Sequence, residues 1–213
     1  KNIFPKNKLC ILRDPAILLN DYAKKKFAKI SNFNFENKKI IIGIGRLTKQ
    51  KNFSLLINAF NKIQKEHKEY ELIILGEGEK KSKLIELTNK YGLGKKVHFF
   101  GFEENVYKYL KKADCFILTS LWEDPGFVLL EAGLSNTSII SSDCKNGPIE
   151  ILDNGNNGYL FENNNLNSLL EKFEEFKKTD KIKLIHKKIL LKKELKKFTL
   201  YSHFKCFKKI INF

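Results

Sequence analysis

One run of residues constrains the fold of this chain more than any other. Residues 39–45 read K-I-I-I-G-I-G, a continuous apolar stretch rich in β-branched side chains. A strand with one face in water alternates apolar and polar residues, whereas an unbroken apolar run is typical of a strand buried on both faces. Such strands occur in parallel sheets that helices cover on both sides. The run therefore predicts a parallel sheet at the centre of the fold.

Strand-like runs and helical periods alternate after this stretch. Residues 53–64 place apolar side chains at helical spacing, and residues 71–75 form the next strand-like run. The further expected strands are 97–100, 115–119, 138–141 and 158–161, and the further expected helices are 80–91, 106–112, 127–134, 149–152 and 166–176. Repeated β-α-β crossovers of this length predict an α/β fold, a doubly wound parallel sheet with helices on both faces.

Composition divides the chain into three segments. We expect residues 1–37, with a short strand at 9–12, to be a linker from another domain, and residues 38–176 to form the sheet domain. Residues 177–213 carry thirteen lysines and two acidic residues among regularly spaced apolar side chains, which predicts a tail of one or two basic amphipathic helices. Such a tail can lie on an anionic membrane or pack on another domain, and both interpretations remain open.

The limits of the chain suggest what kind of protein it comes from. It begins at Lys1 and contains no methionine, so we interpret it as a fragment of a longer protein. No apolar run approaches the roughly 18 residues that span a bilayer, which predicts a soluble or peripheral protein. The four cysteines and four histidines show no metal-ligand or nucleophile spacing, so no metal site is expected and the thiols are interpreted as reduced.

Parallel sheets of this type bind ligands beyond the carboxyl ends of their strands, at a switch point in strand order. The loop after the first strand contains Arg46 and Lys51 just before a helix. Two cations at a helix N-terminus can clamp a diphosphate, although they can also be solvated loop charges. Gly43 and Gly45 do not complete a G-x-G-x-x-G pattern, which argues against a nicotinamide cofactor.

A second candidate stretch, residues 120–131, closes a strand, turns at Pro125 and Gly126, and opens a helix. Glu123 and Glu131 bracket the turn with seven residues between them. Carboxylates at these places can accept hydrogen bonds from sugar and ribose hydroxyl groups, although a helical glutamate is also common without any ligand. The loop D-C-K-N-G-P-I-E at 143–150 is interpreted equally well as a ligand loop or as a simple turn.

Several motifs occur together and in a fixed order. They are G-R-L-x-x-Q-K-N, V-H-F-F-G-F, A-D-C-F-I-L-T-S-L-W-E-D-P-G-F-V-L-L-E-A-G, S-S-D-C-x-x-G-P-x-E-I-L and N-G-x-x-G-Y-L-F. In this order they resemble the C-terminal nucleotide-sugar-binding domain of the retaining GT-B-fold glycosyltransferases, often called glycosyl transferases group 1. The resemblance covers roughly residues 38–176, and it implies a Rossmann-like domain that forms the C-terminal half of a GT-B fold.

The resemblance implies a role for each matching residue. Arg46 and Lys51 would bind the donor diphosphate and stabilise the leaving group, while Glu123 would hold the donor sugar. Glu131 would bind the ribose. The remaining donor-binding residues would be Gly126, Phe127 and Val128, through their backbone, and Phe102 and Glu103, beside the base. The family's usual E-G-F-G is E-D-P-G here, which puts the sugar contacts of the first glycine's backbone in doubt.

The implied function is that of the donor-binding part of a retaining, hexosyltransferase-type enzyme. It would transfer sugar from a nucleoside diphosphate sugar, with UDP-sugar as the expected donor, to a glycan or lipid-linked acceptor in surface polysaccharide or glycolipid assembly. A missing N-terminal domain would complete the site. We expect no cofactor, metal or nucleic acid, and a cytoplasmic location with the tail on the inner membrane face as an option. The alternatives are a nucleotide-sugar epimerase of the same architecture and a non-enzymatic basic nucleic-acid-binding module.

Overall fold

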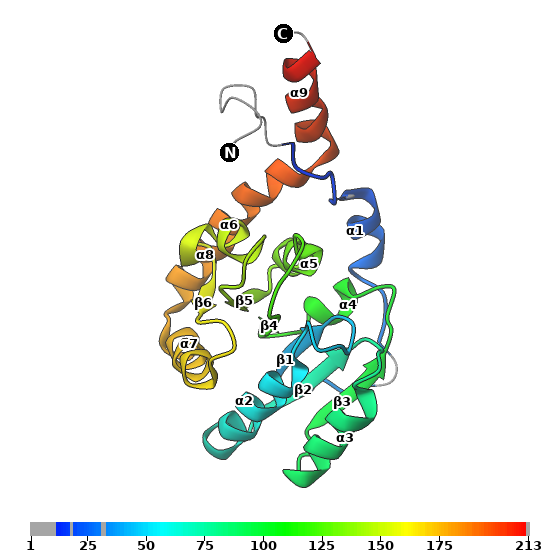
Figure 1. Cartoon of the computed structure of the whole chain (residues 1–213). Coiled ribbons are helices and arrows are strands. Elements are labelled where there is room, and N and C mark those ends of the chain that lie inside the picture. The colour runs from blue at the N-terminus through cyan, green and yellow to red at the C-terminus, as the bar shows by residue number, and fades with distance from the viewer. Residues whose placement is uncertain (1–11, 18, 31–32, 212–213) are drawn as a thin grey trace, which may run out of the picture.

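The computed structural model describes residues 12–17, 19–30 and 33–211, and it contains a six-stranded parallel sheet (Figure 1). The strand order is β3-β2-β1-β4-β5-β6, and each neighbouring pair is parallel. The strands are β1 (Lys39–Ile44), β2 (Tyr70–Leu75), β3 (Val97–Gly101), β4 (Cys115–Leu118), β5 (Ser138–Ser142) and β6 (Tyr159–Phe161). The doubly wound parallel sheet is therefore confirmed, with strand ends within two residues of the predicted ones.

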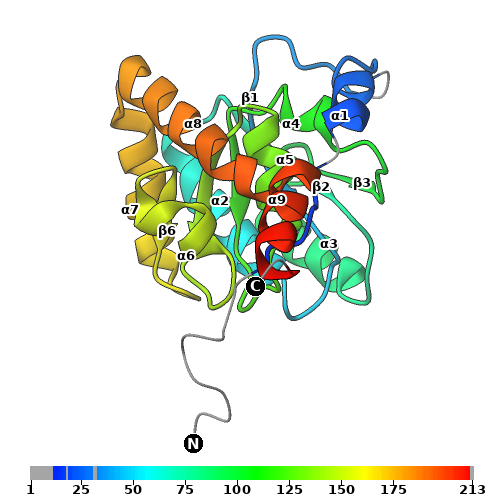
Figure 2. The same ribbon diagram turned by 90° about the horizontal axis from the view of Figure 1, so that it is seen from above.

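Helices cover both faces of the sheet (Figures 1 and 2). One face carries α2 (Phe53–Glu66), α3 (Lys81–Lys90) and α7 (Leu166–Lys178). The other carries α4 (Tyr107–Leu110), α5 (Phe127–Leu134), α6 (Pro148–Ile151) and α8 (Lys181–Leu195). The short helices α1 (Leu19–Lys25), η2 (Asp153–Gly155) and η3 (Lys196–Phe198) and the helix α9 (Leu200–Ile211) complete the described elements.

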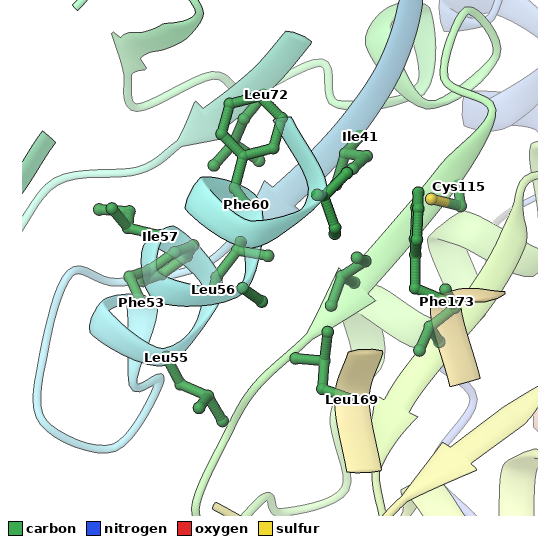
Figure 3. Packing of buried hydrophobic residues seen from close by; sticks show 14 of the residues in the cluster. Ile41, Phe53, Leu55, Leu56, Ile57, Phe60, Leu72, Cys115, Leu169 and Phe173 are labelled. Carbon is green, nitrogen blue, oxygen red and sulfur yellow. The ribbon is translucent and has the colours of Figure 1, made fainter. Parts of the chain in front are cut away.

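The central run explains this two-sided covering. Successive side chains of a strand point to opposite faces, so Ile41 joins the hydrophobic cluster under α2 and α7, while Ile40 and Ile42 join the cluster under α5 and α8. Figure 3 shows Ile41 near Leu72 and Phe60. Burial of one such side chain stabilises the fold by about 1.5 to 3 kcal/mol. A strand with apolar residues on both faces can therefore only be stable with helices on both sides.

The C-terminal segment is helical, and its two long helices differ in their packing. Helix α8 packs on α5 and buries Leu191 and Leu195 in the second cluster. Helix α9 has no buried residue and projects away from the sheet in Figure 1. Within the described part of the chain, no helix combines the length and the apolar character needed to cross a membrane.

The segment before the sheet meets this C-terminal segment. Ile17 is buried and forms an isolated parallel bridge with Thr199, and its backbone N–H donates to the carbonyl of Phe198 at 3.1 Å. This contact joins positions far apart in the sequence, and no local pattern predicted it. The short strand expected at 9–12 lies almost wholly outside the described residues, and the predicted segment boundaries remain predictions.

Candidate functional site

The topology places the site between β1 and β4. Strand β1 lies between β2 and β4. The chain first adds β2 and β3 on one side of β1 and later adds β4 on its other side. Strand order reverses between β1 and β4, and parallel sheets bind ligands at the carboxyl edge of such a switch point. The loops after β1 and β4 are the two loops that contain Arg46, Lys51 and Glu123.

Hydrogen bonds hold the two loops together. The Thr119 hydroxyl, at the end of β4, donates to the carbonyl oxygens of Lys51 at 2.9 Å and Asn52 at 3.1 Å. The backbone N–H of Leu121 donates to the carbonyl of Gln50 at 2.8 Å. Because these bonds satisfy backbone groups that precede α2, they fix where the lysine side chain begins relative to the β4 loop.

Lys51 and Glu123 form a buried ion pair. Lys51 Nζ lies 2.5 Å from Glu123 Oε1, and the side chains are 14% and 4% exposed. The hydroxyl of Ser120 donates to the same oxygen at 2.5 Å. Sequence reasoning assigned the lysine to phosphate and the glutamate to sugar and did not foresee that each neutralises the other. Their sequence separation of 72 residues explains why no local signal reveals the pair.

A pocket of about 630 Å³ contains four of the predicted site residues, whereas Lys51 and Glu123 are not among the residues that line it. The four are Arg46, Phe102, Glu103 and Glu131. Pockets of roughly 300 to 1,000 Å³ are typical of small-molecule sites. Apolar side chains from the strand ends form part of its wall, and Phe102 is 77% exposed. We call it the donor pocket, after the role that the sequence resemblance implies for these residues. Its other lining residues are Ile44, Gly45, Leu75, Gly76, Glu77, Glu104 and Val106.

Burial changes the acidity of Glu131, which lines the same pocket. Burial raises the pKa of this carboxyl from 4.5 to about 7, and the charge of Lys25 offsets part of the rise. A carboxyl with such a pKa is close to half ionised at neutral pH, so it can accept or donate a hydrogen bond. The glutamate lies one turn into α5, where its side chain reaches the pocket from the helix.

Glu103 is held in place by its own neighbours. Tyr109 Oη donates to Glu103 Oε1 at 2.8 Å, and Lys108 Nζ lies 3.1 Å from Oε2. Two partners restrict the rotation of this carboxylate, so it forms a fixed acceptor at the pocket wall. Glu77 and Glu104, which sequence reasoning did not name, line the same pocket. The available signal was the position of Glu77 directly after β2, because parallel sheets bind ligands beyond the carboxyl ends of their strands.

The turn before α5 requires glycine. Gly126 has φ of 85° and forms the N-cap of α5 without any side-chain cap. A side chain at Gly147 would place its Cβ 1.8 Å from the carbonyl oxygen of Pro125, so the loop after β5 packs directly against this turn. The 143–150 loop thus supports the turn. Phe127 is partly exposed and Val128 is partly buried in the second cluster. Neither they nor Gly126 line the donor pocket.

A possible metal-ligand cluster lies elsewhere. Among the described residues, one group of three potential ligands comes together, formed by Glu66, His67 and Glu174. It joins the C-terminal end of α2 to α7, and α2 runs from the carboxyl edge of the sheet toward its amino edge. The cluster is therefore at the opposite edge from the donor pocket. The expectation of a metal-independent donor site remains a prediction.

Comparison with known proteins agrees with this geometry. Residues 24–190 match the family described as Glycosyl transferases group 1. The chain belongs to the glycosyl transferases group 1 family. The match covers the sheet, the donor pocket and most of α8, so the resemblance seen in the sequence motifs is confirmed.

Curated relatives of the chain are glycosyltransferases that it matches over part of their length. The chain is 42% identical over 135 residues to an uncharacterised glycosyltransferase of Methanocaldococcus jannaschii, covering 63% of this chain and 32% of that protein. It is 34% identical over 149 residues, 70% of the chain and 40% of the relative, to the N-acetylgalactosamine-N,N'-diacetylbacillosaminyl-diphospho-undecaprenol 4-alpha-N-acetylgalactosaminyltransferase of Campylobacter jejuni. The chain thus spans a third to two fifths of the length of these relatives.

Solved structures of similar proteins confirm the fold. A Staphylococcus aureus TarM mutant, in complex with Fondaparinux, alpha-GlcNAc-glycerol and UDP, has a TM-score of 0.75 and 26% identity, covering 88% of this chain and 38% of that chain. Anabaena HepE in complex with UDP has a TM-score of 0.76 and 17% identity, covering 93% and 55%. The second likeness concerns the fold alone. The predicted C-terminal half of a GT-B fold is therefore confirmed.

Proposed function

We propose that this chain forms the donor half of a glycosyltransferase that uses a nucleoside diphosphate sugar, with UDP-sugar as the expected donor. The observation that carries the proposal is the donor pocket, which collects Arg46, Phe102, Glu103 and Glu131 at the switch point of the sheet. Its volume is large enough for one nucleotide, and the cationic side chain of Arg46 lies at its rim. TarM and HepE, which share the fold, each bind UDP.

In this proposal the pocket residues divide the nucleotide between them. The base lies against the Phe102 ring and donates a hydrogen bond to the Glu103 carboxylate, which its neighbours already hold in place. Glu131 binds ribose hydroxyls, and its near-neutral pKa of about 7 lets it do so without a full negative charge close to the phosphates. Arg46 can hold a phosphate with two parallel hydrogen bonds.

The Lys51 and Glu123 pair lies where charge develops during transfer. The bond between the anomeric carbon and the diphosphate oxygen breaks, the acceptor hydroxyl oxygen bonds to the same carbon, and the hydroxyl proton passes to an oxygen of the departing diphosphate. The departing diphosphate carries the electron pair away as negative charge. Lys51 and Arg46 stabilise that charge as fixed cations. Glu123 keeps the lysine oriented before the donor arrives and then binds sugar hydroxyls, with overall retention of anomeric configuration.

The acceptor side of the reaction is proposed on the relatives' chemistry. The Campylobacter relative acts on a diphospho-undecaprenol-linked glycan, and a Staphylococcus aureus relative, 28% identical over 171 residues, is a poly(ribitol-phosphate) alpha-N-acetylglucosaminyltransferase. We therefore place this chain in surface polysaccharide or glycolipid assembly. Because it spans two fifths or less of these relatives, we propose that an N-terminal domain supplies the other wall of the cleft.

Calorimetric titration tests the donor site directly. UDP should bind the chain with a one-to-one stoichiometry, while uridine binds more weakly because it lacks the diphosphate. Absence of binding by UDP, GDP and ADP alike would overturn the proposal. Product analysis of the longer protein with a panel of nucleotide sugars then tests retention. Conversion of a nucleotide sugar to its epimer without any acceptor would support the epimerase alternative instead.

A further inference from the structure

Helix α8 has two apolar stripes that face in different directions. Leu191 and Leu195 form the inner stripe, which is buried against α5. Ile182, Ile185 and Ile189 are spaced by three and four positions, so they share another side of the helix. These three side chains are 80%, 57% and 48% exposed. The domain core therefore covers the leucines and leaves the isoleucines, which we call the isoleucine stripe, open to solvent.

The isoleucine stripe is not explained by the stability of the helix. Isoleucine has a lower intrinsic helix propensity than lysine, glutamate or glutamine, so it gives no advantage on the exposed side of a helix. Single exposed apolar residues are common, but a row of them along one helix forms a patch, and such patches mark contact surfaces. Helix α8 runs along the outside of the molecule in Figure 2. The stripe is therefore placed where a partner can reach it.

Lysines border the stripe. Lys192 and Lys193 follow Ile189 by three and four positions, and Lys181 precedes Ile185 by four, so all three lysines lie beside the isoleucines on the helix surface. They are exposed, and among the described residues none of them has an ion-pair partner. The stripe thus combines apolar side chains with free positive charge.

Acidic side chains do not offset this charge. Glu194 is the one acidic residue between positions 181 and 211, and its side chain is 15% exposed and lies 2.5 Å from Lys197 Nζ. Asp180, just before the helix, uses its carboxylate to accept a hydrogen bond from the backbone N–H of Lys183. The surface of α8 around the stripe is therefore positively charged and complements an anionic partner.

The residue types favour a lipid surface over a protein partner. The cores of protein interfaces are enriched in aromatic residues, methionine and arginine and depleted in lysine. Helix α8 has no aromatic residue, methionine or arginine, but it has six lysines. At a bilayer surface, branched apolar side chains enter the boundary of the acyl chains, while long lysine side chains reach the phosphate groups of the lipids.

We propose that the isoleucine stripe of α8 docks this domain on an anionic lipid bilayer. The helix lies parallel to the membrane surface with Ile182, Ile185 and Ile189 in the headgroup boundary and the bordering lysines on lipid phosphates. Because Leu191 and Leu195 keep α8 attached to α5, docking needs no unfolding of the domain. The inference stands on this helix and does not depend on the assignment of the donor pocket.

Flotation of the chain with lipid vesicles tests the proposal. The chain should bind vesicles of phosphatidylcholine and phosphatidylglycerol, bind pure phosphatidylcholine weakly, and dissociate as the salt concentration rises. In Ile182→Gln/Ile185→Gln/Ile189→Gln the partition coefficient should fall about tenfold or more, since the apolar contact is lost. These side chains are exposed, so the urea unfolding curve should stay unchanged. Absence of binding by the wild-type chain, or equal binding by this variant, would overturn the proposal.

The matched apolar control is on α9. Leu200→Gln/Phe204→Gln/Phe207→Gln replaces three similarly exposed side chains of the neighbouring amphipathic helix. This variant should keep most of the binding to anionic vesicles. A loss as large as that of the α8 variant would place the contact on α9 and would contradict the proposal.

A second pair of variants tests the lysines. Lys181→Gln/Lys192→Gln/Lys193→Gln should weaken binding to anionic vesicles about a hundredfold, because each lysine near the membrane surface contributes about one charge contact. The control Lys83→Gln/Lys90→Gln/Lys95→Gln removes the same charge from exposed positions in and after α3, on the other face of the sheet. Equal weakening in both would show attraction by net charge alone and would overturn the assignment to α8.

Other occupants of the stripe give different results. If a longer protein that contains this chain fails to bind the vesicles that the chain binds, another domain covers the stripe. If analytical ultracentrifugation shows a dimer that the triple isoleucine variant abolishes, and vesicles do not bind, a second copy covers it. Either result would replace the bilayer as the partner of α8.

Discussion

At the scale of single residues, the site depends on where charge is neutralised and where it is not. Lys51 and Glu123 neutralise each other inside the protein, whereas Arg46 lies at the rim of the donor pocket and has no ion-pair partner in the described ranges. Glu131 avoids part of the cost of a buried charge through its raised pKa. These three situations give three different expected responses to substitution.

Removal of the arginine should weaken diphosphate binding selectively. Arg46→Ala loses charge-assisted hydrogen bonds worth roughly 1.5 to 3 kcal/mol, so UDP affinity should fall about tenfold to a hundredfold. Uridine affinity should change little, because uridine has no phosphate. Arg46→Lys should lie between wild type and alanine, since lysine keeps the charge but not the paired donors. Calorimetry with both ligands measures this, and equal losses for UDP and uridine would argue against a phosphate role.

The buried ion pair should show strong coupling. Lys51→Met leaves the Glu123 carboxylate buried without its cation, so the free energy of unfolding should fall by about 3 kcal/mol. The double variant Lys51→Met/Glu123→Gln removes both charges and should recover most of that loss. Urea denaturation of the wild type, both single variants and the double variant gives the coupling energy. Additive effects would mean that the pair contributes nothing beyond its separate members.

Glu131 should make stability depend on pH. Its pKa is about 7 in the folded protein against 4.5 as the ordinary value, so the unfolded chain releases this proton at lower pH. The contribution of this residue to stability therefore falls as pH rises from about 4.5 to 7 and is constant above. The free energy of unfolding of Glu131→Gln, relative to that of the wild type, should rise by roughly 2 to 3 kcal/mol between pH 4.5 and pH 8.

Urea denaturation of the wild type and of Glu131→Gln, at pH 4.5 and at pH 8, measures this change in relative stability. The exposed Glu86→Gln variant on α3 controls for the loss of a glutamate, and its stability relative to wild type should be the same at both pH values. A Glu131 variant that behaves like this control would show that the carboxyl is not desolvated in the folded protein.

At the scale of elements, the packing of α8 on α5 shows that this helix is part of the domain core. Gly133 in α5 faces Leu191 and Leu195, and a Cβ there would lie 3.0 Å from atoms of both leucines. The missing side chain lets the two helices approach closely. Sequence reasoning grouped α8 with the basic tail, because residues 177–213 carry thirteen lysines, and it left open whether their apolar side chains pack on another domain or lie on a membrane.

Loss of one of these leucines should destabilise the domain. Leu191→Ala removes a fully packed side chain next to Gly133, so the free energy of unfolding should fall by about 2 to 5 kcal/mol. The exposed Leu200→Ala in α9 is the control and should change stability by less than about 0.5 kcal/mol. Chemical denaturation measures both. A small effect at Leu191 would mean that α8 does not form part of the cooperative unit.

At the scale of the whole molecule, the two ends of the described chain meet next to the sheet domain. Ile17 and Thr199 form a bridge, and His203 Nδ1 in α9 lies 2.8 Å from the carbonyl oxygen of Arg13. The segment before the sheet is therefore held by the C-terminal helices. Helix α9 itself keeps an exposed apolar side formed by Leu200, Phe204, Phe207 and Ile211.

Truncation should separate the roles of the two C-terminal helices. A chain that ends at residue 199 keeps α8 and its buried leucines, so it should keep a cooperative thermal transition. A chain that ends at residue 179 exposes the face of α5 that α8 covers, so it should lose cooperative unfolding or aggregate. Near-ultraviolet circular dichroism during heating distinguishes these results. Similar transitions for both truncated chains would contradict the assignment of α8 to the core.

The sequence by itself determined the fold class and the positions of the candidate loops. The run around Ile41, the helical spacing around Phe60 and the glycine after β4 are local patterns, and local patterns report which side of an element is buried. Because the strands are parallel, their carboxyl ends had to meet at one edge. Arg46, Glu123 and Glu131 could thus be assigned to one region without coordinates.

Only the tertiary structure decided which of these residues touch. Lys51 meets Glu123 across 72 positions of sequence, and Gly133 receives two leucines from α8. Each contact depends on the register of strands and on the angle between helices, which are set by the packing of the whole core. Hydrophobic periodicity carries no information on these distances, so the pairing of charges appears only when the chain is folded.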